Sequence, residues 1–214
     1  MLGERAAGGR PGRSSVLDVA AGPSFERYVS GLPGGLAAHP AAQAKGSLVR
    51  NLLEEQPPEV LRTLPAAIRP LALDPPMDSD WVPEAQLCAL VHALAERRGF
   101  REAQLLAWVR ARKRALFSSP LYQLLMSVGS PEAMLRHAGR RWSNFHRGST
   151  LELDGYADDG VRVTLAFPPG LFDAVMLRAT AETFAAALQA ARAPRPVVVV
   201  EAAGPGFARY LGRW

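Results

Sequence analysis

The fold is decided by the carboxy-terminal stretch TLELDGYADDGVRVTLAFPPGLFDAVMLRATAETFAAALQAARAPRPVVVVEAAGPGFARYLGRW, which spans residues 150–214. Apolar and polar residues alternate over residues 150–156 and 161–167, and the Asp159-Gly160 pair between these segments is a hairpin signal. Residues 171–192 have the Ala-rich pattern of a long helix, and residues 197–202 and 207–213 are predicted strands around Gly204-Pro205-Gly206. The order hairpin, helix, hairpin predicts a four-stranded antiparallel sheet with one helix across a face.

The sequence ahead of this stretch is predicted to be helical. Serine or proline near the start and glycine near the end mark helices at residues 83–99, 119–129 and 130–147. A further helix is predicted over residues 101–117. Shorter helices are predicted from Ser47 to the Pro57-Pro58 pair, over residues 59–68, and over one or two turns at residues 24–31. Residues 32–40 and 71–80 are interpreted as a loop and a linker from their Pro, Gly and Asp content.

We therefore predict the α+β class, with an N-terminal helical block followed by the four-stranded antiparallel sheet. Residues 1–23 combine Gly, Ala and Arg with little periodic apolar content, which predicts a disordered tail. Residues 24–214 are predicted to form a single domain, helical over residues 24–147 and sheet-forming over residues 148–214.

Composition excludes several classes of protein. The chain has 214 residues, of which 48% are hydrophobic and 21% charged, the values of an ordinary globular protein. Its single cysteine, Cys88, permits no intramolecular disulfide, so a cytoplasmic location is expected. No stretch approaches the roughly 18 uninterrupted apolar residues of a membrane span, and the first 13 residues lack the apolar core of a signal peptide. We expect no membrane partner.

The net charge of +5 raises the question of nucleic-acid binding. The densest basic segment consists of Arg110, Arg112, Lys113 and Arg114, which point to different sides of one predicted helix. A phosphate-binding helix concentrates its charge on one face. Nucleic acid is therefore not the expected partner, and a DNA-associated regulator remains an alternative.

Motifs of catalysis and metal binding do not occur in the sequence. There is no Gly-x-Ser-x-Gly motif, and Gly204-Pro205-Gly206 lacks the third glycine and the following helix of a dinucleotide loop. Cys88 and His92 are four residues apart on one predicted helix, but two ligands are too few for a tetrahedral metal site. His137 is placed at the edge of an apolar helix face, and His146 is expected to interact with carbonyls at a helix end. We predict no catalytic residue, no metal and no cofactor.

The candidate site is the seam between the helical block and the sheet. Eight side chains are expected to meet there, most of them as core and a minority as the lining of an apolar pocket: Trp108, Trp142, Phe145, Phe167, Phe172, Met176, Tyr210 and Trp214. Arg112 and Arg141 fall on apolar helical stripes, and a buried arginine needs an anionic partner from the protein, a ligand or another chain. The predicted ligand-binding residues are Arg112, Arg141, Trp142, Phe145, Phe172, Met176 and Tyr210.

Four segments carry a resemblance to a known family: KGSLVRNLLEE from Lys45, Arg140-Arg141-Trp142, Gly148 before the first hairpin, and the final YLGRW at residues 210–214. Over residues 44–214 the chain resembles a family of myxobacterial multi-copy proteins of similar length and unknown function. That family distantly resembles 4-vinyl-reductase-type and haem-nitric-oxide-binding-type domains, in which helices and an antiparallel sheet enclose a ligand or form a docking surface. The resemblance implies a sensory or interaction module and supplies no catalytic residue.

The haem-nitric-oxide-binding type carries a Tyr-x-Ser-x-Arg motif for the haem propionates. The corresponding text here, YVSGL at residues 28–32, lacks the arginine, so haem is not expected. The predicted function is a non-enzymatic cytoplasmic module of bacterial signalling or regulation that binds a protein partner or a small apolar ligand. The alternatives are a homodimeric scaffold that associates through its last strands and long helix, the DNA-associated regulator, and an enzyme whose cleft the sequence does not display.

Overall fold

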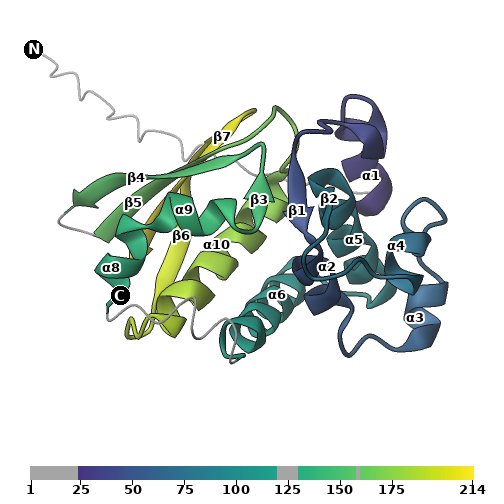
Figure 1. Ribbon diagram of the computed structural model, residues 1–214, viewed down its shortest axis with the longest axis horizontal. Coiled ribbons are helices and arrows are strands. Elements are labelled where there is room, and N and C mark those ends of the chain that lie inside the picture. Colours follow the sequence, from purple (N-terminus) through teal and green to yellow (C-terminus); the bar gives the residue numbers. More distant parts are fainter. Residues whose placement is uncertain (1–23, 120–129, 158–159) are drawn as a thin grey trace, which may run out of the picture.

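The structure is a computed structural model that describes residues 24–119, 130–157 and 160–214 (Figure 1). The predicted tail at residues 1–23 and the predicted helix at residues 119–129 lie outside these ranges, apart from Ser119. None of the described helices has the length and apolar character needed to cross a membrane.

The carboxy-terminal part has the predicted topology. Its sheet has the order β4-β5-β7-β6, and every neighbouring pair is antiparallel. One helix, α10, packs against this sheet and lies between it and α6 (Figure 1). The α+β class is confirmed. The elements are β4 (Thr150–Ala157), β5 (Gly160–Ala166), α10 (Ala174–Ala190), β6 (Val197–Gly204) and β7 (Phe207–Arg213).

The amino-terminal part is mainly helical. Its two longest helices, α5 and α6, agree closely with the predicted segments 83–99 and 101–117. The elements are α1 (Ser24–Gly31), the 3₁₀ turn η1 (Gly35–Ala37), β1 (Gln43–Lys45), α2 (Gly46–Leu53), α3 (Pro58–Arg62), α4 (Arg69–Leu73), β2 (Trp81–Pro83), α5 (Glu84–Arg97), α6 (Glu102–Phe117), α8 (Pro131–Arg136), α9 (Ala138–Ser143) and β3 (His146–Arg147).

A second, miniature sheet was not predicted. Its strand order is β2-β1-β3, with antiparallel pairs such as Ala44 with Val82 and Ala44 with His146. Each strand has only two or three residues, which is too short to show the alternation that identifies a strand in sequence. This sheet joins three segments that are far apart in the chain.

The predicted helix at residues 130–147 was wrong in its extent. It is interrupted at His137, and α9 ends at Ser143. The interruption lets α9 lie against β4, where the backbones approach closely because residue 139 is glycine. A Cβ atom on Gly139 would lie 2.7 Å from the carbonyl oxygen of Leu151.

The predicted helix at residues 59–68 and the linker at residues 71–80 also need correction. The first helix is only α3, and a second, α4, enters the predicted linker. Pro58 and Pro70 each stand in the first turn of their helix, where proline is tolerated because that backbone nitrogen has no intrahelical acceptor.

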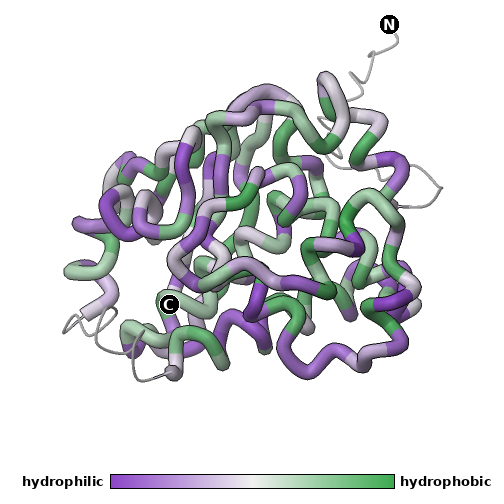
Figure 2. Tube along the Cα trace, turned by 45° about the vertical axis from the view of Figure 1, so that its right-hand side comes forward, coloured by the Kyte–Doolittle hydropathy of each residue, from purple (hydrophilic) through white to green (hydrophobic). Residues whose placement is uncertain are grey.

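One cluster of buried apolar side chains joins the helical part to the sheet. It extends from Phe25 in α1 to Tyr210 in β7. Along the helices and strands hydrophobic residues alternate with hydrophilic ones, as expected when one side of each element faces the core (Figure 2). The two predicted parts therefore share a core.

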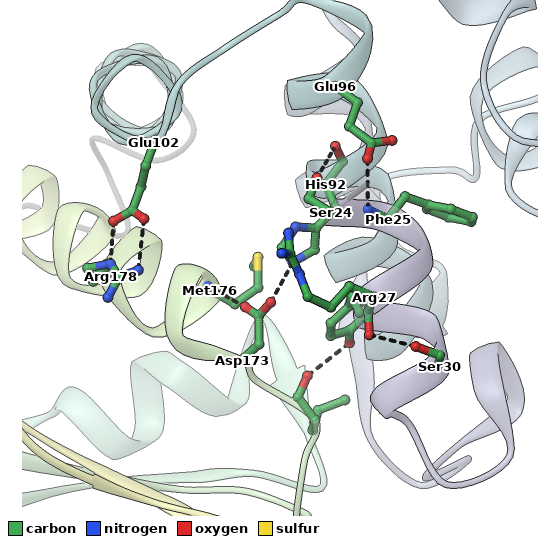
Figure 3. Close-up of polar contacts among 12 residues, drawn as sticks. Ser24, Phe25, Arg27, Ser30, His92, Glu96, Glu102, Asp173, Met176 and Arg178 are labelled. Atoms are coloured by element: carbon green, nitrogen blue, oxygen red, sulfur yellow. Dashed lines mark hydrogen bonds and ion pairs between the residues drawn. The ribbon is translucent and has the colours of Figure 1, made fainter. Parts of the chain in front are cut away.

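Polar contacts fix the beginning of α10 against α1, α5 and α6 (Figure 3). The Tyr28 hydroxyl donates to the carbonyl of Leu171 at 2.9 Å, and His92 Nε2 lies 3.1 Å from Asp173 Oδ2. Asp173 also caps α10, since its Oδ1 accepts from the Met176 amide at 2.8 Å. These contacts orient the helix that covers the sheet.

Candidate functional site

A cavity of about 180 Å³ lies where α6, α9 and α10 meet the four-stranded sheet. An apolar cavity of about 150 Å³ is large enough to hold a benzene-sized molecule. The cavity therefore has the size for a small organic ligand. Most of its lining is apolar and includes Leu87, Val91, Val109, Phe117, Met134, Leu135, Leu151, Val161, Val163, Ala179, Phe184, Ala187 and Leu188.

The periodicities of the sequence explain why these side chains converge. Alternate residues of β5, Val161 and Val163, point from the sheet toward the helices. From α10 the lining side chains recur at three- and four-residue spacing on one helix face. Ala179 and Ala187 lie on that face, and their small side chains leave space between helix and sheet.

Six of the seven predicted ligand-binding residues line the cavity: Arg141, Trp142, Phe145, Phe172, Met176 and Tyr210. They come from α9, the segment after it, the entry to α10, α10 itself and β7. Their role in binding stays a prediction. Trp108, Phe167 and Trp214 are not among the lining residues.

The structure places the seventh residue, Arg112, outside the cavity, on the side of α6 that faces α2. Its guanidinium pairs with the carboxylates of Glu54 and Glu55, the latter at 2.7 Å, and donates to the Asn51 carbonyl at 2.9 Å. The expectation of an anionic partner is therefore met within the protein. Arg112 fixes α2 against α6 and has no place in the site.

The sequence analysis missed a buried acid and histidine pair at one end of the cavity. Glu84, which is 2% exposed, places its Oε2 2.9 Å from His146 Nδ1. The His146 ring stacks on Trp142 with 3.8 Å between ring centroids, and Trp142 Nε1 donates to Ser149 Oγ at 2.9 Å. The expected contact of His146 with helix-end carbonyls was wrong, because His146 belongs to β3.

The miniature sheet explains how Glu84 and His146 meet. Strand β2 leads directly into Glu84, and β3 contains His146. Both strands pair with β1, so Glu84 and His146 are brought side by side although 62 positions separate them. No sequence pattern signals such a pairing.

The second missed residue is Lys113, which lines the cavity and is 9% exposed. Burial lowers its pKa from 10.5 to about 8, with a further lowering from the charge of Arg112 and an opposing influence from Glu84. Among the residues that the structure describes, none forms a hydrogen bond or ion pair with its ammonium group. Its spacing was a usable signal, since Lys113 stands four residues from both Val109 and Phe117, which also line the cavity.

Tyr210 is a second buried polar residue of the cavity lining, and its hydroxyl interacts with the Thr180 side chain. It is fully buried, and no group in the described ranges makes a well-formed hydrogen bond to its hydroxyl. Burial raises the pKa of this hydroxyl above its ordinary value. A buried hydroxyl that lacks a well-formed hydrogen bond costs free energy and is uncommon in folded proteins. The cavity therefore contains polar groups that a ligand could satisfy.

Cys88 and His92, which stand four residues apart on α5, both lie in the packed core. Among the described residues, no group of three or more His, Cys, Asp or Glu side chains is placed to hold a metal ion. His92 stacks on Tyr28 with 5.0 Å between ring centroids and contacts Asp173. Burial raises the pKa of the Cys88 thiol well above its ordinary value, which keeps it protonated and a poor nucleophile.

Comparison with known proteins does not assign a family. No protein-family model and no curated protein matches the sequence. Among solved structures, the chain is similar to one described as "Modulating Heme Redox Potential Through Protein-Induced Porphyrin Distortion". The two are 12% identical with a TM-score of 0.49, and the match covers 78% of this chain and 94% of that chain. At this level of similarity neither a family nor a ligand carries over.

Proposed function

We propose that the protein is a non-enzymatic module that binds a small, largely apolar molecule in the cavity between α6, α9, α10 and the sheet. The observation that carries this proposal is the cavity itself, with its apolar lining and few polar groups, which is the composition of a small-molecule site.

The energetic cost of the cavity supports a binding role. Protein interiors are close-packed, and a residual cavity lowers stability by about 24 cal/mol for each Å³. That rate applies to an enclosed void, so for this partly open cavity of 180 Å³ it sets an upper bound of about 4 kcal/mol. A ligand that fills the space recovers part of this free energy, so binding stabilises the fold.

The position of the cavity supports a regulatory use of binding. Its walls come from the helical part and from the sheet, so a ligand contacts both. Occupancy then favours the arrangement in which α9 and α10 pack on the sheet. A partner protein that recognises this arrangement would sense the ligand.

The experiment compares two matched substitutions on α10. Ala187→Leu places extra methyl groups in the cavity, whereas Ala190→Leu adds the same groups at an exposed position of the same helix. Toluene and 1-hexanol are titrated while thermal unfolding and ¹H–¹³C methyl NMR spectra are recorded.

We expect both compounds to raise the unfolding temperature of the wild type and the Ala190→Leu variant, and to shift methyl signals of lining residues such as Leu87 and Val163. The Ala187→Leu variant should respond weakly because its cavity is filled. An equal response of the two variants, or no response from the wild type, would contradict the proposal.

A second candidate is the homodimeric scaffold. Strand β6 is an edge of the sheet, and Val197, Val199 and Phe207 on β6 and β7 are 57%, 43% and 41% exposed. Exposed apolar side chains on an unpaired edge favour association. Sedimentation of the wild type and of Val199→Glu tests this candidate; a wild type that stays monomeric at high micromolar concentration rejects it.

A further inference from the structure

We propose, resting on the binding function above, that the ligand carries a carboxylate and that the Lys113 ammonium binds it. The ligand class is a small apolar carboxylic acid, with its hydrocarbon part in the cavity and its charged end at α6.

The environment of Lys113 favours an anionic ligand. Its side chain lies between Val109 and Phe117 on α6, and all three line the cavity. Lys113 is only 9% exposed as a whole residue, and no described residue forms an ion pair or hydrogen bond with its ammonium group. A buried ammonium without an anionic partner is unfavourable, so the site is incomplete without an anion.

The charged groups of the cavity wall also favour an anionic ligand. Among the described lining residues the acid is Glu84, and Lys113 supplies a buried basic group. The Glu84 carboxylate contacts His146 at 2.9 Å. The one carboxylate among the described lining residues is therefore already in contact with His146, and a monovalent anion would balance the charge of Lys113.

The chemistry of the lining favours a carboxylate over other anions. Lysine is a compact point charge, whereas a phosphate group is usually held by several donors such as an arginine fork or a set of backbone amides. The lining is mostly apolar and fits a hydrocarbon group with a single charged end. Tyr210 lines the same cavity, and its hydroxyl can serve a second polar group of the ligand.

The experiment uses hexanoate and 1-hexanol, which have the same chain length and differ in charge. Each is titrated into the wild type, Lys113→Met and Lys45→Met. Lys45 is the matched control because it is the other lysine of the chain and its ammonium instead contacts the Ser79 carbonyl and the Trp81 ring. Dissociation constants are read from NMR titrations.

We expect Lys113→Met to weaken hexanoate binding about 10- to 100-fold, the range for losing a hydrogen bond to a charged group. Binding of 1-hexanol should be nearly unchanged, and Lys45→Met should leave both affinities unchanged. In wild-type protein labelled with ¹³C-lysine, hexanoate should raise the pKa of Lys113, and the NMR signals of Lys45 should not move. This second measurement does not depend on the folding of a variant.

The outcomes separate the two proposals. Suppose that 1-hexanol binds, that the wild type and Lys113→Met bind hexanoate equally well, and that hexanoate leaves the pKa of Lys113 unchanged. The carboxylate assignment is then overturned, and the binding function stands. If neither compound binds, both proposals fail.

Discussion

Replacing Lys113 by methionine should stabilise the ligand-free protein at neutral pH. The pKa of Lys113 falls from 10.5 in the unfolded chain to about 8 in the folded protein, mainly through burial. One pKa unit corresponds to 1.36 kcal/mol, so the charged lysine lowers stability by about 3 kcal/mol at pH 7. Methionine has a similar length and no charge, and it removes this penalty. For a protein of this size the gain corresponds to a rise of roughly 6 to 12 °C in Tm.

The sign of the pH dependence gives a sharper test. Because the folded-state pKa is lowered, the unfolded chain binds more protons between about pH 8 and 10.5, and wild-type stability rises with pH in that range. The advantage of Lys113→Met should therefore decrease to about 1 kcal/mol at pH 9.5. Urea unfolding of both proteins at pH 7.0 and 9.5 measures this difference.

Lys45→Met is the control for the loss of a lysine. The exposed contacts of Lys45 with Ser79 and Trp81 should contribute less than about 1 kcal/mol to the free energy of unfolding. The difference in stability between Lys45→Met and the wild type should be the same at both pH values. If Lys113→Met is less stable than the wild type at pH 7, or if its advantage is the same at both pH values, Lys113 is not a buried, unpaired ammonium and the reasoning is refuted.

Three further outcomes follow from single contacts. Burial raises the pKa of Asp173, but His92 and the backbone amides of Met176 and Val175 outweigh it and lower this pKa overall. The free energy of unfolding of the wild type should therefore fall more steeply than that of Asp173→Asn as the pH drops below about 4. Urea unfolding at pH 6 and pH 3 measures both changes, and equal losses of free energy would contradict the prediction. Gly139→Ala should lower the free energy of unfolding by about 1 to 3 kcal/mol, because the added Cβ meets the backbone of β4 rather than a movable side chain. An unchanged urea midpoint would show that α9 can move away from β4. Cys88 should react with a thiol reagent only as fast as the protein unfolds, since it is fully buried and its pKa is raised; rapid labelling of native protein would contradict this.

The sequence predicted the large sheet because each element is long enough to show its period. The strands β4 and β5 alternate over seven or eight residues, and α10 has an apolar stripe over 17 residues. The expectation that the seam between this sheet and the helices holds the candidate site also agrees with the position of the cavity. Local periodicity and hairpin signals were sufficient for these features.

The polar part of the site could not be predicted in the same way. The contact between Glu84 and His146 depends on strands of two or three residues, which have no periodicity to detect. Arg112 and Lys113 are adjacent in sequence and differ by 100° in direction around α6. Arg112 pairs with Glu54 and Glu55, whereas Lys113 faces the cavity. A small error in the orientation of a helix exchanges their roles, so only coordinates assign them.

The cavity and Lys113 together connect ligand binding to stability. The empty volume costs at most about 4 kcal/mol, and the buried charge of Lys113 costs about 3 kcal/mol at neutral pH, against a typical net stability of 5–15 kcal/mol. An apolar ligand without a charge reduces only the first cost, and Lys113→Met reduces only the second. A small carboxylic acid reduces both, so its stabilising effect should exceed that of the matching alcohol in the wild type and fall below it in Lys113→Met, where the carboxylate has no counter-charge. That comparison of two ligands and two proteins therefore measures the coupling between the volume of the cavity and the charge at its wall.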